Sequence, residues 1–146
     1  MTRALVVVFA LSLLAGCSEP FIVFAGGALS GEIGTPPDDW SELRGEDTFQ
    51  LETRPEDPYS VNIWAVGIGP DVYIGTGPDG TTWSSHLYDD PRVRLRVGET
   101  LYLLEAHPVI AHGERRRVAA AFAEKYDMNR EENWVSNAQV FRLDRR

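Results

Sequence analysis

The chain has 146 residues, of which 14 are lysine or arginine and 22 are aspartate or glutamate, so its formal net charge at pH 7 is −8. So acidic a chain is a poor partner for nucleic acid, whose phosphates require a basic surface, and its length suits one domain. The single cysteine excludes an intramolecular disulfide, so packing alone must stabilise the domain.

The first sixteen residues have the parts of a secretory signal. Arg3 supplies the positive start, and a run that is apolar apart from one serine follows from Ala4 to Leu14. This run is shorter than the roughly twenty apolar residues that a membrane-spanning helix needs. Ala15 and Gly16 then precede Cys17, and the junction from Leu14 to Cys17 resembles the lipobox of bacterial lipoproteins.

That resemblance implies cleavage before Cys17 and acylation of its thiol and of the new amino terminus. Two or more acyl chains hold a protein stably on a membrane, whereas one binds only marginally. An ordinary secreted protein with a spare cysteine is the alternative, but it leaves the lone thiol without a partner. Ser18 follows the cysteine in place of an aspartate, which resembles the outer-membrane sorting pattern of enterobacterial lipoproteins. We therefore expect an envelope protein on the periplasmic face of the outer membrane.

Composition divides the remaining chain into two parts. Glycine and proline are frequent after the cysteine, and no hydrophobic period is sustained before Pro36. We therefore expect a signal peptide over residues 1–16, a lipid-anchored tether over 17–35 and one globular domain over 36–146.

The first half of that domain reads as strands. Alternating polarity predicts a strand over Phe49–Thr53 and another over Tyr59–Val66. The turn signal Gly69-Pro70-Asp71 and the apolar run Val72–Thr76 predict that the second strand forms a hairpin with the run that follows. Trp83–Tyr88 is then a short turn or helix, which ends before Pro91.

A second hairpin, a helix and a closing strand follow. Valine and leucine alternate with three arginines over Arg92–Val97, and Thr100–Ala106 returns after a glycine turn. The arginines could line a cofactor or dimer face, although the solvated face of a half-buried strand is the ordinary origin of this pattern. Helical spacing then favours a helix over Gly113–Tyr126, with Glu114, Arg115, Arg116 and Glu124 solvated. A last strand ends the chain near Leu143. These elements predict an α+β fold, mainly β, in which one helix packs on a small antiparallel barrel.

A series of different short motifs follows in a particular order over about seventy residues. They are Asn62–Val66, Asp71–Thr76, Trp83 with His86–Leu87, Asp90–Val93, Gly98 with Tyr102 and Ala106, and Glu114–Arg115 through Ala121–Phe122 to Lys125–Tyr126. Their order and spacing resemble the flavin-binding split-barrel superfamily, the fold of pyridoxamine-phosphate oxidases and deazaflavin-dependent nitroreductases. The resemblance implies a split barrel, FMN or a deazaflavin as cofactor, and a homodimer.

The resemblance also implies where a cofactor would lie. Backbone groups of Val72–Thr76 would meet the flavin ring, and the loop Gly77–Thr82 would approach the phosphate. The side chains that could serve are Trp64, Thr76, Thr81, Thr82, Trp83 and His86.

The chain departs from the superfamily at the positions that would hold the flavin phosphate. From Tyr59 through Leu87 there is no lysine or arginine, although phosphate is best met by charge-assisted donors. We therefore favour a non-catalytic module that binds a small molecule or a partner protein. Two alternatives remain open: a flavin- or deazaflavin-dependent oxidoreductase, and a structural, dimeric envelope protein.

Other chemistry has little support in the sequence, and we assign no catalytic residue. The spacing of His86, His107 and His112 fits no metal motif, so we expect no metal site. The acidic stretch Glu46–Asp57 matches no calcium loop and reads as soluble surface. Trp40, Trp64, Trp83 and Trp134 are expected mostly in the core, because large aromatic side chains dominate burial in small barrels.

Overall fold

The computed structural model of this chain describes residues 26–128 and 134–146, apart from the side chains of Trp134 and Ser136. The predicted signal peptide, the predicted lipid site at Cys17 and the predicted burial of Trp134 lie outside the described residues. Within those residues, no helix is both long and apolar enough to cross a membrane.

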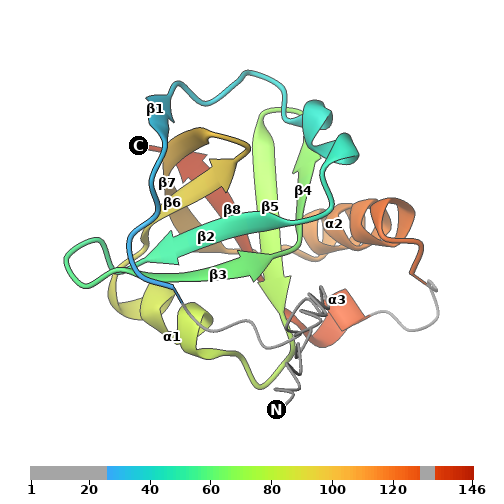
Figure 1. Cartoon of the computed structure of the whole chain (residues 1–146). Coiled ribbons are helices and arrows are strands. Elements are labelled where there is room, and N and C mark those ends of the chain that lie inside the picture. Colours follow the sequence, from blue (N-terminus) through green and yellow to red (C-terminus); the bar gives the residue numbers. More distant parts are fainter. Residues whose placement is uncertain (1–25, 129–133) are drawn as a thin grey trace, which may run out of the picture.

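One curled sheet dominates the part of the chain that is described (Figure 1). Its strands are β1 (Glu32–Gly34), β2 (Phe49–Thr53), β3 (Tyr59–Ile63), β4 (Ala65–Ile68), β5 (Asp71–Thr76), β6 (Arg92–Val97), β7 (Thr100–Pro108) and β8 (Gln139–Arg145). They follow the order β3-β2-β6-β7-β8-β5-β4 with antiparallel neighbours, and β1 lies off this path, parallel to β7.

Within the described residues, four short or medium helices accompany the sheet. They are the 3₁₀-helix η1 (Ser41–Gly45) and the α-helices α1 (Thr82–Asp89), α2 (His112–Lys125) and α3 (Trp134–Asn137). Figure 1 shows α2 along the side of the sheet near β4, and α1 across one end of the barrel. The predicted split barrel, α+β and mainly β, is confirmed; α1 forms where a short turn or helix is predicted, and the short α3 is added to the predicted elements.

The first predicted hairpin is confirmed between β4 and β5, but the predicted extent of its first strand is wrong. Residues 59–66 form two strands, because the ladder breaks at Trp64: β3 pairs with β2, whereas β4 pairs with β5. β3 and β4 stand at opposite ends of the strand order, yet one residue joins them. The sheet must therefore curl until its two edges meet at Trp64, whose side chain is 49% exposed.

The inside of the barrel holds one apolar cluster. Leu51, Ile74, Val93 and Leu95 are fully buried there, and Trp40 of the segment before η1 closes one end of the cluster. Burial of these aliphatic and aromatic side chains supplies the main stabilisation of the barrel.

A second cluster lies between the sheet and α2. Tyr73 of β5 and Val140 of β8 point outward to meet Val118 and Phe122 of the helix. β5 is thus buried on both faces, which explains its nearly continuous apolar sequence.

Two residues predicted as solvated on α2 instead fix the helix to the sheet. Glu114 accepts hydrogen bonds from Tyr73 Oη and Arg142 Nη1, both at 3.0 Å. Arg115 donates to the backbone carbonyls of Val109, Val135 and Ala138. Their prediction from the helical period was therefore wrong, because the period locates the apolar face but not polar groups at its border.

Part of the segment that the sequence places in the tether lies on the barrel. Gly26 exchanges two backbone hydrogen bonds with Ser60, and β1 pairs with β7. Between these contacts, Glu52 accepts the Leu29 N–H at 2.6 Å and the Arg94 Nε–H at 2.7 Å. Glu52 is only 1% exposed, so the prediction that it belongs to the soluble surface is wrong. A buried carboxylate needs such partners.

The three arginines of β6 carry carboxylate partners. Arg92 forms ion pairs with Asp90 at 2.6 Å and Glu56 at 2.8 Å, and Arg94 pairs with Glu52. Arg96 donates to the Gly98 carbonyl at 2.9 Å. Their donors are engaged within the chain, on the outer face where the alternating pattern places them.

Replacing Glu52 should release the N-terminal segment from the barrel. Glu52→Ala leaves Arg94 and the Leu29 amide without their acceptor, and we expect a loss of about 3 kcal/mol in unfolding free energy, because Arg94 still reaches water. The Leu29 amide should exchange its hydrogen faster in the same variant. Glu99→Ala is the control, since Glu99 makes an exposed ion pair that contributes little. Equal stability and equal Leu29 exchange in both variants would contradict this role.

Candidate functional site

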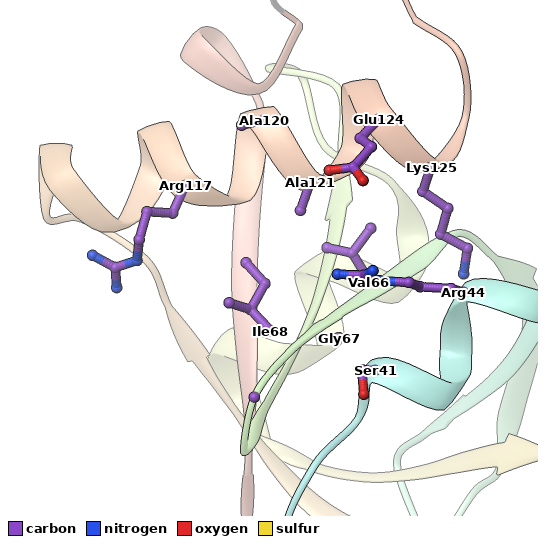
Figure 2. A pocket seen from close by; sticks show the side chains of 11 residues that line it. Ser41, Arg44, Val66, Gly67, Ile68, Arg117, Ala120, Ala121, Glu124 and Lys125 are labelled. Atoms are coloured by element: carbon purple, nitrogen blue, oxygen red, sulfur yellow. The ribbon is translucent and has the colours of Figure 1, made fainter.

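A cavity of about 560 Å³ lies where η1, β4 and α2 meet (Figure 2). Its lining residues are Ser41, Arg44, Val66, Gly67, Ile68, Gly69, Arg117, Ala120, Ala121, Glu124 and Lys125. A volume of this size falls within the range of small-molecule sites, which is roughly 300–1,000 Å³.

Small residues leave the space open. Arg117, Ala120, Ala121 and Glu124 recur at helical spacing on one face of α2, so two methyl groups lie between two long side chains. Opposite them, Gly67 lets the backbone of Trp40, the residue before η1, approach β4 closely: a Cβ there would lie 2.2 Å from the Trp40 carbonyl oxygen. The helix and the strand therefore approach without filling the gap between them.

Lys125 ties the three walls together. Its Nζ donates hydrogen bonds to the Leu43 carbonyl at 2.6 Å and the Ala65 carbonyl at 2.9 Å, and lies 4.5 Å from the centre of the Phe49 ring. Burial lowers the pKa of Lys125, and nearby Asp47 and Glu46 oppose that effect. Its ammonium group is thus engaged in holding the site and is not a free contact for a ligand.

Tyr126 completes the same edge. Its hydroxyl accepts the Ala65 N–H at 3.1 Å and donates to the Ala65 carbonyl at 3.0 Å. β4 is an edge strand, so these side chains replace a neighbouring strand at Ala65. Burial raises the pKa of Tyr126, which keeps its hydroxyl protonated as a donor.

Two arginines, Arg44 and Arg117, line the cavity. Hydrogen bonds from Ser41 lower the pKa of Asp39, and the charge of Arg44 contributes to the same shift. Neither Arg44 nor Arg117 makes a hydrogen bond or an ion pair with another described residue, and both are exposed. Glu124 faces the same space from α2, and it too makes no ion pair among the described residues (Figure 2). The cavity thus offers charges of both signs that form no ion pair among the described residues, with the positive ones in excess.

A smaller cavity of about 180 Å³ lies on the other side of η1. Asp39, Glu42 and Glu46 line it together with Trp40 and Tyr102, whose rings meet edge to face at 5.0 Å. η1 therefore separates an acidic cavity from the larger cavity with its arginines.

The predicted cofactor residues lie elsewhere. Thr81 and Thr82 begin α1, where the Thr81 N–H donates to Ser84 Oγ at 2.9 Å. Trp83 is 7% exposed and belongs to the inner core. His86 Nδ1 lies 2.9 Å from Thr53 Oγ1, and its ring meets the Tyr59 ring edge to face.

The remaining two predicted residues are separated from that group. Thr76 ends β5 beside Gln139 of β8. Trp64 stacks on Tyr126 with ring centres 4.6 Å apart and planes 13° apart, and its other face is open. None of the six predicted residues lines either of the two cavities.

These positions do not fit a flavin phosphate within one chain. No cation occurs from Tyr59 through Leu87, and the Thr81 amide is already bonded to Ser84. At Gly80 a Cβ would lie 2.8 Å from Gln139 Nε2, so the loop is packed against β8 and leaves no cradle there. The Trp83 side chain could contact a flavin ring only by leaving the core.

Within residues 26–128 and 134–146, no group of three histidine, cysteine, aspartate or glutamate side chains is placed to hold a metal ion.

Sequence reasoning missed the larger cavity. Its charged residues are 73 positions apart at Arg44 and Arg117, and neither belongs to a motif. The available signal was local: a helix face with two adjacent alanines between an arginine and a glutamate leaves unfilled space against a glycine-bearing strand.

Comparison with known proteins supports the fold alone. No known family profile and no curated protein matches the chain. Among solved structures, it resembles the conserved hypothetical protein Rv2991 of Mycobacterium tuberculosis, at a TM-score of 0.56 and 20% identity over 71% of this chain and 76% of that one.

Two further structures share the split barrel. A candidate 5-nitroimidazole antibiotic resistance protein of Bacteroides thetaiotaomicron gives a TM-score of 0.56 and 14% identity over 84% of this chain and 86% of that one. A candidate pyridoxamine 5′-phosphate oxidase of Listeria innocua gives a TM-score of 0.52 and 11% identity over 69% of this chain and 85% of that one.

Lys125→Met should loosen the walls of the larger cavity. The variant keeps the apolar stem but leaves the carbonyls of Leu43 and Ala65 without a donor, and we expect a loss of about 2 kcal/mol in unfolding free energy. Urea denaturation measures it, with Arg116→Met as the control on an exposed position of the same helix. If the Lys125→Met protein is as stable as the control, the hydrogen bonds of Lys125 do not hold these walls together.

His86 should make stability depend on pH. Desolvation, reinforced by Arg54, lowers the pKa of His86 below its usual 6.5 in the folded chain. The unfolded chain therefore binds the proton more readily, so stability should fall as pH drops through about 6.5. The urea midpoint at pH 8 and pH 5.5 tests this, and His86→Gln should lose part of the difference. The exposed His112→Gln should retain it, and an unchanged difference in both variants would assign the effect to other groups.

Proposed function

We propose that this chain is a lipid-anchored protein of the bacterial cell envelope whose split barrel binds a small molecule and performs no redox chemistry. The observation that carries the binding role is the cavity of about 560 Å³ between η1, β4 and α2. It combines apolar walls with charged side chains, which is the usual composition of a small-molecule site.

The anchor is supported by the sequence. The apolar run from Ala4 to Leu14 ends in Leu14-Ala15-Gly16-Cys17, the lipobox-like junction. Acylation of Cys17 would attach an otherwise acidic chain to a membrane that its surface charge does not favour. The serine after the cysteine supports the outer membrane, with the barrel on its periplasmic side.

A flavin- or deazaflavin-dependent oxidoreductase is the second candidate. The likeness of the fold to a candidate pyridoxamine 5′-phosphate oxidase favours it. The missing cations around the predicted phosphate position and the buried side chain of Trp83 disfavour it. A homodimer, which the superfamily resemblance implies, is compatible with both candidates and with a structural role.

One preparation tests the proposed function. We expect the full chain, extracted from membranes in detergent, to carry acyl groups on Cys17 in its intact mass and to show no flavin absorbance. Added FMN or deazaflavin should not saturate it at micromolar concentration. Cys17→Ala should lose the acyl mass and is the control for the anchor.

The two parts of the proposal fail separately. A co-purifying flavin band, or saturable micromolar binding of FMN, would replace the binding role with the oxidoreductase. A wild-type chain that is cleaved but carries no acyl group would make the protein an ordinary secreted one.

A further inference from the structure

The charges at the larger cavity run against those of the chain as a whole. The protein carries a formal net charge of −8, yet Arg44, Arg117 and Lys125 line this cavity with only one carboxylate, that of Glu124. The ammonium group of Lys125 already donates hydrogen bonds to two backbone carbonyls. The charged groups open to a ligand are therefore those of Arg44, Arg117 and Glu124.

Like Arg44 and Arg117, Arg116 and Arg146 make no ion pair among the described residues, but of these four arginines only Arg44 and Arg117 line the cavity. Six other arginines form ion pairs with carboxylates: Arg54, Arg92, Arg94, Arg96, Arg142 and Arg145. Arg44 extends from η1 into the space beneath α2, and Arg117 descends from the helix beside Ile68 (Figure 2). A planar guanidinium group with several N–H donors matches the two oxygens of a carboxylate, and neither of these arginines is paired with one among the described residues.

Apart from Ser41 and the charged residues, the side chains that line the cavity are apolar. Val66 and Ile68 of β4 face Ala120 and Ala121 of α2, and none of these side chains has a polar atom. A ligand here would therefore place a charged head at the arginines and an apolar body over the alanines.

We propose that the cavity between η1, β4 and α2 binds a small organic acid with one negative charge, held by Arg44 and Arg117, and with a ring-sized apolar body. The inference rests on the proposed small-molecule function and adds the chemical class of its ligand. Glu124 limits the total charge, since its carboxylate repels a second negative group placed near the first.

A matched series of probes tests the sign of the head group. The full chain in non-ionic detergent is titrated calorimetrically with 2-naphthoate, 2-naphthamide and 2-naphthylmethylammonium, which share one ring system and differ in charge. Heats from detergent alone are subtracted. We expect 2-naphthoate to bind about tenfold or more tightly than the other two, because only its head group receives charge-assisted hydrogen bonds.

Variants with opposite expected effects locate the binding. Arg44→Gln and Arg117→Gln should each weaken 2-naphthoate roughly three- to tenfold, and Glu124→Gln should tighten it about threefold. Arg116→Gln is the matched control, since Arg116 is an exposed neighbour of Arg117 that does not line the cavity. Ala120→Leu, at an exposed helical position that tolerates leucine, should block all binding there.

The outcomes separate this inference from the proposed function. If 2-naphthamide binds as tightly as 2-naphthoate and Ala120→Leu abolishes both, the cavity holds small molecules but the anion preference is overturned. Tighter binding of 2-naphthylmethylammonium, or equal effects of Arg116→Gln and Arg117→Gln, also overturns it. So does the absence of binding by all three probes, whereas the flavin spectrum described above tests the proposed function independently.

Discussion

A covalent constraint shapes this barrel: one residue, Trp64, joins the two strands that end the strand order. Since consecutive residues cannot separate by more than about 3.8 Å between Cα atoms, the first and last strands must come together at that point. The curl of the sheet is thus fixed by chain connectivity as well as by its natural twist. Among the described residues no ladder pairs β3 with β4, so the barrel is not closed by hydrogen bonds between them.

Because β4 is an edge strand, its backbone needs hydrogen-bond partners from outside the sheet, and residues at the end of α2 supply them. The backbone of β4 at Ala65 faces away from the sheet and receives its hydrogen bonds from Tyr126 and Lys125 at the end of the helix. The same lysine reaches η1, so helix, strand and 3₁₀-helix converge on one ammonium group. The larger cavity lies beside this point of convergence, where α2 presents alanine in place of a long side chain.

The sequence predicted an element well where its apolar residues recur at the period of a strand or a helix. The hairpin of β6 and β7 and the helix α2 match their predicted ranges closely, because valine, leucine and phenylalanine recur at the spacing of the elements themselves. The break at Trp64 was hidden, since the alternation runs through it unchanged. The burial of Glu52 was hidden too, because its partners Leu29 and Arg94 lie 23 and 42 positions away. The cavity arises from such distant pairings and could not be read from any one segment.

Docking of the N-terminal segment on the barrel has a consequence for reach. If the chain were free up to Pro36, a lipid on Cys17 would allow the barrel to move about 65 Å from the membrane, at roughly 3.4 Å per extended residue. Because Gly26 is already paired with Ser60, the chain from Cys17 to Gly26 would span at most about 30 Å if Cys17 carries the proposed lipid. The anchored barrel would then stay within a thin layer next to the lipid, and its ligands would be those that are concentrated there.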